Sequence, residues 1–77
     1  MNNYKIKLDI ADVMEFNRVA NSLTKPVTLY QGERKVNGKS LLGIYTFDLC
    51  NPIFINIDSK HESEIINTKF SKWLVVE

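Results

Sequence analysis

Residues 27–44 read VTLYQGERKVNGKSLLGI, and this segment is the most informative about the fold because its local pattern changes twice. Residues 27–30 alternate and are rich in β-branched and aromatic side chains, which predicts a β-strand. The tripeptide QGE at 31–33 is typical of a hairpin turn, and residues 34–36 then predict a short polar strand. We therefore expect a β-hairpin in the middle of the chain.

A short helix is expected directly after this hairpin. The dipeptide NG at 37–38 predicts a turn, and Ser40 is placed to cap a helix from Leu41 to Thr46. Apolar residues occur on most sides of that helix, and they are Leu41, Leu42, Ile44, Tyr45 and Phe47. A helix of one or two turns does not stand alone in water, so its apolar face must be pinned to a core. Part of that face is expected to remain exposed.

A strand and a helix are predicted before this central stretch. Apolar and charged residues alternate over residues 4–10, which indicates a half-buried strand. Apolar residues then recur at helical spacing over residues 13–23, and Asp12 with Glu15 has the pattern of a capping box. The helix should stop before Pro26, because the residue preceding a proline is pushed out of the helical region.

A second strand–helix unit is predicted after the central stretch. The run Ile53–Ile57 is the strongest strand signal in the chain, and Ser59 with Glu62 forms a second capping-box pattern. A helix should follow from about His61 to Lys72. It would bury Ile65, Ile66, Phe70 and Trp73. The segment Leu74-Val75-Val76 has two possible places, at the end of this helix or against the sheet.

The element order β-α-β-β-α-β-α predicts the fold class α+β. A four-stranded, mainly antiparallel sheet with its helices on one face, an open-faced sandwich, would bury every apolar stripe. The 77 residues, 44% of them hydrophobic and 25% charged, suit a single small domain over residues 1–77. The core of such a domain is just large enough to fold without a disulfide or a metal ion.

Charge and composition narrow the classes of function. Ten Lys and Arg against nine Asp and Glu give a net charge of +1, which removes the overall attraction of a dedicated nucleic-acid binder but permits a local patch. The basic cluster Arg34, Lys35 and Lys39 is expected to be a solvated hairpin face. No apolar run approaches the roughly 18 residues of a membrane span. We expect a cytoplasmic protein that does not act on membranes or directly on nucleic acid.

Residues suited to catalysis or metal binding are scarce. His61 is the only histidine and has no partner in a recognisable pattern, so an exposed surface position is expected. Cys50 is the only cysteine, which excludes an internal disulfide and favours a buried or half-buried inert thiol. The three glycines are scattered and form no phosphate-binding loop. We expect no enzyme activity, no catalytic residue, no cofactor and no metal site.

The central stretch resembles HPr, the histidine-containing phosphocarrier of the bacterial sugar phosphotransferase system. The family pattern is close to V-N-x-K-S-[IL]-[ML]-G-[VIL]. It is matched by Val36, Asn37, Lys39, Ser40, Leu41, Leu42, Gly43 and Ile44. The strand at 53–57 resembles the last strand of that family, and the element order agrees along essentially the whole chain. The resemblance implies that Ser40 is a regulatory phosphorylation site, because a dedicated kinase phosphorylates the matching serine in some members.

The chain departs from this family where HPr carries its phosphoryl group. HPr has a histidine there, in a Gly-[IL]-His-[AT]-Arg-Pro motif, whereas residues 8–13 here read LDIADV. Asp9, Ile10, Ala11 and Asp12 thus form a degenerate phosphocarrier loop. Asp9 or Asp12 could accept a phosphoryl group as an acyl phosphate, but two carboxylates without a cation would repel an incoming phosphate. His61 lies in the wrong element to replace the missing histidine.

The leading hypothesis is therefore a regulatory or partner-binding HPr-like domain without the phosphocarrier histidine. Its recognition surface would consist of Lys39, Leu41, Leu42, Ile44, Tyr45 and Phe47, and the resemblance implies HPr kinase or a transcriptional regulator as partners. One alternative is a divergent phosphocarrier that uses Asp9, Asp12 or His61. Another is a structural or oligomerisation module that kept only the fold.

Overall fold

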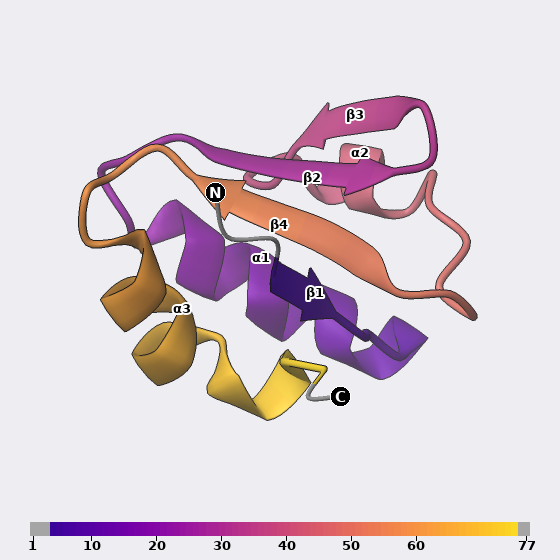
Figure 1. Cartoon of the computed structure of the whole chain (residues 1–77). Helices are drawn as coiled ribbons and strands as arrows, with labels where there is room; N and C mark the ends of the chain where they lie inside the picture. The colour runs from indigo at the N-terminus through magenta and orange to yellow at the C-terminus, as the bar shows by residue number, and fades with distance from the viewer. Residues whose placement is uncertain (1–3, 76–77) are drawn as a thin grey trace.

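The sheet has four antiparallel strands in the order β1–β4–β2–β3 (Figure 1). The computed structural model describes residues 4–75. The strands are β1 (Tyr4–Ile6), β2 (Val27–Gln31), β3 (Arg34–Asn37) and β4 (Ile53–Ile57). The strand with the strongest sequence signal, β4, lies inside the sheet between β1 and β2.

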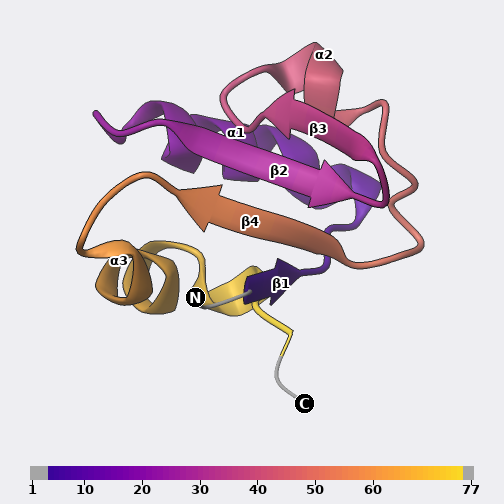
Figure 2. The same ribbon diagram turned by 45° about the horizontal axis from the view of Figure 1, so that its top comes forward.

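The helices cover one face of this sheet and leave the other face uncovered (Figures 1 and 2). They are η1 (Ile10–Asp12), α1 (Val13–Asn21), α2 (Leu41–Ile44), α3 (Glu62–Lys69) and η2 (Ser71–Trp73), of which η1 and η2 are 3₁₀ helices. None of the helices in the described part of the chain is long and apolar enough to cross a bilayer. The architecture confirms the predicted α+β open-faced sandwich and its element order.

The hydrophobic core lies between the helices and the covered face of the sheet. The strand β4 alternates, so that Ile53, Ile55 and Ile57 are buried while the residues between them are exposed. The aromatic rings of Phe16, Phe70 and Trp73 meet beneath the sheet, with ring centroids 5.1–6.1 Å apart. The two helical apolar stripes therefore converge on one cluster.

The N-terminal elements differ from the prediction in length and capping. The strand β1 ends at Ile6, and Ile10, expected in the strand, is 73% exposed in η1. Asp12 does not cap α1 with Glu15. Its Oδ2 instead accepts a hydrogen bond from the Asp9 N–H at 3.0 Å, and the Glu15 carboxylate pairs with the Lys72 ammonium. The chain uses Asp12 to close the 3₁₀ turn that leads from the strand into α1.

The start of the last helix differs in a similar way. The helix α3 runs from Glu62 to Lys69, and the 3₁₀ turn η2 replaces its expected last turn. The Ser59 hydroxyl accepts from the His61 N–H at 3.1 Å, whereas Glu62 Oε2 accepts from the Ile57 N–H at 2.6 Å. The predicted Ser59–Glu62 capping box is therefore wrong, because Glu62 reaches past the turn to the end of β4.

The segment after η2 lies against the sheet, which decides between the two placements left open by the sequence. Leu74 forms a bridge with Ile6, and the Val75 N–H donates to the Lys5 carbonyl at 2.8 Å. The Lys7 N–H donates to the Trp73 carbonyl, also at 2.8 Å. This segment therefore extends the sheet alongside β1. Val76 lies outside the described residues.

Candidate partner-binding surface at α2

Ser40 caps α2 as its sequence context predicts. The Ser40 Oγ accepts the Gly43 N–H at 3.1 Å, and the Ser40 N–H donates to the Asn37 carbonyl at 2.9 Å. The intervening turn needs Gly38, because a Cβ built there would lie 2.6 Å from Cγ1 of Val27. The chain thus leaves β3 through a tight turn that fixes the exposed Ser40 at the start of the helix.

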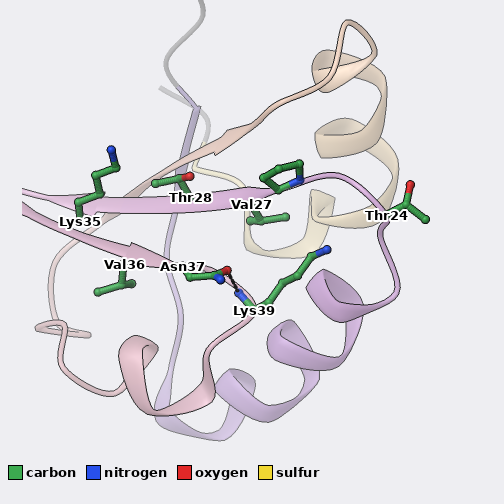
Figure 3. A pocket seen from close by; sticks show the side chains of 8 residues that line it. Thr24, Val27, Thr28, Lys35, Val36, Asn37 and Lys39 are labelled. Atoms are coloured by element: carbon green, nitrogen blue, oxygen red, sulfur yellow. Dashed lines mark hydrogen bonds between the residues drawn. The ribbon is translucent and has the colours of Figure 1, made fainter.

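Two side-chain contacts attach the start of α2 to the end of α1. The Lys39 ammonium donates to the Leu23 carbonyl at 2.6 Å, and Asn21 Nδ2 donates to the Lys39 carbonyl at 3.1 Å. Figure 3 shows the Lys39 side chain extending toward the segment after α1 rather than along α2. Lys39 is half-buried, so it anchors α2 and its ammonium points away from the predicted recognition surface.

Only part of the predicted surface is exposed. Leu42 is 80% exposed and Tyr45 is 42% exposed, whereas Leu41 is half-buried. Ile44 is 0% exposed and Phe47 is 5% exposed, so the prediction that these two side chains take part in recognition is wrong. A single helical turn points its side chains in all directions, and those facing the sheet enter the core. The accessible apolar side chains are Leu42 and Tyr45.

Two further apolar side chains are exposed near the beginning of the chain. Met14 of α1 is 67% exposed and Ile10 of η1 is 73% exposed. Met14 falls outside the buried stripe of α1, and this departure from helical periodicity is the signal in the sequence that marks it as exposed. The helices α1 and α2 contact one another, and each has an exposed apolar side chain, Met14 on α1 and Leu42 on α2.

The degenerate phosphocarrier loop forms the turn before α1. Asp9, Ile10 and Ala11 are exposed and Asp12 is half-buried. Within residues 4–75, neither carboxylate forms an ion pair with a lysine or arginine. An approaching phosphate would therefore meet carboxylates without a paired cation.

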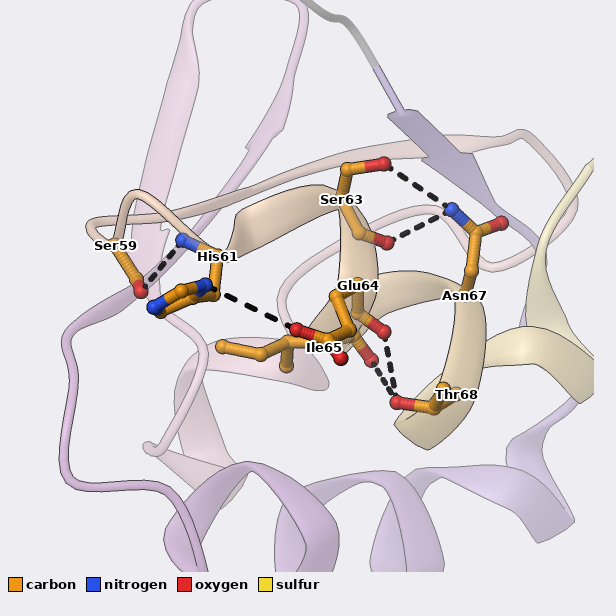
Figure 4. A network of polar contacts seen from close by, with 7 residues as sticks. All are labelled: Ser59, His61, Ser63, Glu64, Ile65, Asn67 and Thr68. Carbon is orange, nitrogen blue, oxygen red and sulfur yellow. Dashed lines mark hydrogen bonds and ion pairs between the residues drawn. The ribbon is translucent and has the colours of Figure 1, made fainter.

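His61 is exposed, as expected, and lies at the start of α3. Its Nδ1 is 3.9 Å from Glu64 Oε1, and the neighbouring polar contacts link residues of α3 to one another (Figure 4). In both ribbon views α3 and the beginning of α1 lie at opposite ends of the molecule. The structure does not bring His61 together with Asp9 or Asp12.

The other residues considered for chemistry occupy separate surface positions. Cys50 is exposed in the turn after α2, so the expected buried or half-buried thiol is wrong. That turn is held by Asp48, whose Oδ1 accepts the Cys50 N–H at 3.0 Å. Arg34 and Lys35 are exposed on β3, as expected for a solvated hairpin. No group of three or more His, Cys, Asp or Glu residues within 4–75 could hold a metal ion.

Comparison with known proteins finds similarity in structure rather than in sequence. No protein-family model matches the chain, and no curated protein matches its sequence. The crystal structure of HPr-C-His from Thermoanaerobacter tengcongensis superposes with a TM-score of 0.67 at 21% identity, covering 92% of this chain and 97% of that one.

A second solved structure is the Bacillus subtilis catabolite repression protein Crh, described as an intertwined dimer with a swapped domain. It superposes with a TM-score of 0.66 at 23% identity, covering 87% of this chain and 79% of that one. Both neighbours are HPr-like proteins, and the likeness in each case extends over most of the two chains. The chain therefore has the HPr-like fold.

Proposed function

We propose that this chain is an HPr-like protein of the phosphotransferase-system family that binds partner proteins and does not carry phosphate on a histidine. The fold and the motif from Val36 to Ile44 support the family, and the sequence LDIADV at 8–13 supports the loss of the carrier function. In this proposal Ser40 is a regulatory phosphorylation site and Leu42 with Tyr45 forms the centre of the partner-binding surface.

The exposure of Leu42 carries this proposal. A leucine that is 80% exposed on a one-turn helix contributes little to the core, yet covering it with a partner would remove apolar area from water. Tyr45, 42% exposed, adds an aromatic side chain of the type enriched in binding hot spots. Leu42 and Tyr45 lie within two helical turns of Ser40, so phosphorylation of Ser40 would alter the binding of a partner that contacts them.

Phosphorylation at Ser40 is compatible with its cap position. The hydroxyl is exposed, and its oxygen already accepts the Gly43 N–H. A phosphate would keep an acceptor oxygen at this site and add a charge of about −2 beside Leu42. A partner that recognises the charged form would bind more tightly, and a partner that needs only the apolar surface would bind more weakly.

The test is intact mass after two parallel incubations of the purified chain. We expect one added phosphate with HPr kinase and ATP, and none with enzyme I and phosphoenolpyruvate. The phosphate should be absent from Ser40→Asn, which keeps a side-chain acceptor for the cap. Phosphate transferred by enzyme I would contradict the proposal and favour the divergent carrier, whose acceptor could then be mapped to Asp9, Asp12 or His61.

The surface itself is tested by the rate of the kinase reaction. Leu42→Asp should lower the initial phosphorylation rate at least about tenfold, as expected when an interface loses a central apolar anchor. The matched control is Thr68→Asp, which introduces the same charge at an exposed position of α3. Equal rates for Leu42→Asp and the control, with both variants folded by circular dichroism, would exclude this surface as the kinase contact.

A further inference from the structure

The uncovered face of the sheet contains a row of four side chains that crosses all four strands. Phe54 of β4 pairs in register with Lys5 of β1 and with Tyr30 of β2, and Tyr30 pairs in turn with Lys35 of β3. Phe54 is 40% exposed and Tyr30 is half-buried, although neither is needed in the core on the other face. Two adjacent aromatic side chains thus face solvent, with a lysine on each side.

Among residues 4–75, Tyr30 and Phe54 form no aromatic ring contact with each other or with a third ring. The ring contacts among residues 4–75 involve only the buried cluster on the other face, and the Tyr30 hydroxyl has no hydrogen-bond partner there. Neighbouring strands lie about 4.8 Å apart, so Tyr30 and Phe54 lie side by side as two separate ring surfaces, which we call the platform. Such a platform offers ring faces and edges for stacking with a planar group.

A pocket adjoins this platform along β2 and β3 (Figure 3). Its volume of about 540 Å³ lies within the range of small-molecule sites. Lys35 lines the pocket and also lies opposite Tyr30, so it joins the pocket to the platform. Thr28 and Asn37 line the same space beside Lys35, and Lys39 lies at its other end (Figure 3).

The pocket offers positive charge and hydrogen-bond donors without a matching carboxylate. No acidic residue lines it, and within residues 4–75 Lys35 forms no ion pair. Asn37 uses Oδ1 to accept the Lys39 N–H at 2.9 Å, which leaves its Nδ2 group as an unpaired donor. Lys39 gives one N–H to the Leu23 carbonyl and keeps two for a ligand. An anionic group fits this set of donors.

We propose that the uncovered sheet face and this pocket bind a free nucleotide. Its base would stack on Tyr30 and Phe54, and its phosphate would bind Lys35 and the Asn37 amide in the pocket. Because Lys35 lines the pocket and also lies opposite Tyr30, the site suits a ligand that has a planar part and an anionic part. Bases of single-stranded nucleic acids stack on sheet aromatics beside basic groups, and a single nucleotide could make the same contacts.

A free nucleotide fits the charge better than a nucleic-acid strand or a second copy of the chain. A strand gains affinity from many phosphate contacts, whereas the pocket offers two lysines and the whole chain has a net charge of +1. A second copy packed face to face would place lysines of the two sheets against each other, which is unfavourable.

The test is a titration of the full chain followed by ¹H–¹⁵N NMR, with four probes: AMP, adenosine, inorganic phosphate and a short single-stranded oligoadenylate. We expect saturable shifts with AMP at amides of β2, β3 and β4. Adenosine and phosphate alone should bind at least about fivefold more weakly than AMP, because each lacks one half of the recognised group. The oligoadenylate should bind no more tightly per site than AMP.

Two substitutions test separately the residue expected to bind the base and the residue expected to bind the phosphate. Tyr30→Leu and Lys35→Gln should each weaken AMP binding about fivefold or more, the lower end of losses seen when a stacking partner is removed. Lys69→Gln, which neutralises an exposed lysine of α3, is the matched control and should leave the affinity unchanged. The proposal is overturned if AMP causes no saturable shifts, if phosphate alone binds as tightly, if only the oligonucleotide binds, or if both variants bind like the control.

Discussion

At the scale of single residues, Ser40 has a structural role that can be separated from any regulatory one. Its Oγ accepts the Gly43 N–H at 3.1 Å, and α2 is only four residues long. Ser40→Ala should therefore lower the free energy of unfolding by about 1 kcal/mol, the usual effect of losing an N-cap. Ser40→Asn should lose much less, because asparagine is an equally good cap.

The measurement is urea denaturation of the two variants beside the parent chain. If Ser40→Asn is as unstable as Ser40→Ala, the cap is not the stabilising contact. This control matters for any phosphorylation experiment, since a loss of α2 would by itself disturb Leu42 and Tyr45.

Single residues also show where sequence reasoning succeeds and where it stops. Ser40 could be placed because capping depends on local sequence alone. Ile44 could not be assigned to the core, because a helix of one turn has no periodicity that distinguishes its buried side from its exposed side. Phe47 could not be assigned either, because it lies beyond the end of α2 at Ile44, which is earlier than the expected end at Thr46. Cys50 was misplaced since its exposure depends on how the turn after α2 lies on the fold.

At the scale of elements, Glu62 links the end of β4 to the beginning of α3. Its Oε2 accepts the Ile57 N–H at 2.6 Å, and Ile57 is 2% exposed. Glu62→Ala should cost about 1–3 kcal/mol of stability, the cost of leaving a buried backbone donor unpaired. Glu62→Gln should cost less, because its side-chain carbonyl can still accept the bond.

Amide hydrogen exchange at Ile57 checks this contact directly. Exchange should accelerate in Glu62→Ala more than in Glu62→Gln, with the amides of Leu29 and Ile55 as internal references in the paired strands. Unchanged protection at Ile57 in Glu62→Ala would show that this carboxylate does not hold the end of β4.

Strands and helices could be predicted from the sequence because their apolar residues repeat with different periods. The ends of these elements could not be predicted in the same way. The alternation of β4 and the stripe of α1 mark a strand and a helix from the sequence alone. The pairing of Asp12 with Asp9 and of Glu62 with Ile57 depends on the path between elements. A capping-box pattern therefore identified a helix start in each case while naming the wrong partner. For the same reason, the sequence alone could not predict that Tyr30 and Phe54 lie side by side, because their adjacency depends on the register of β2 with β4.

For the molecule as a whole, one edge of the sheet is covered by Leu74 and Val75. The Leu74–Ile6 bridge and the Val75 N–H bond to Lys5 lie along β1, whose other side pairs with β4. The opposite edge, β3, is short and bears Arg34 and Lys35, and charged side chains at an edge discourage pairing with another sheet. The two edges are therefore protected by different means, one by backbone pairing and one by charge.

Removing the chain from Leu74 onward should expose the edge of β1. The truncated protein would lose the bridge to Ile6 and the bond to the Lys5 carbonyl, while the Trp73 carbonyl would still accept the Lys7 N–H. We expect a stability loss of about 1–3 kcal/mol, from unpaired backbone groups and lost packing of Leu74. We also expect association that increases with concentration, because an open strand edge can pair with a second chain.

Leu74→Ala in the full chain is the control, since it shortens the side chain and keeps the Val75 N–H. The degree of association is measured by sedimentation velocity at several concentrations. If the truncated chain and the control sediment alike, the segment from Leu74 onward does not protect the edge of β1.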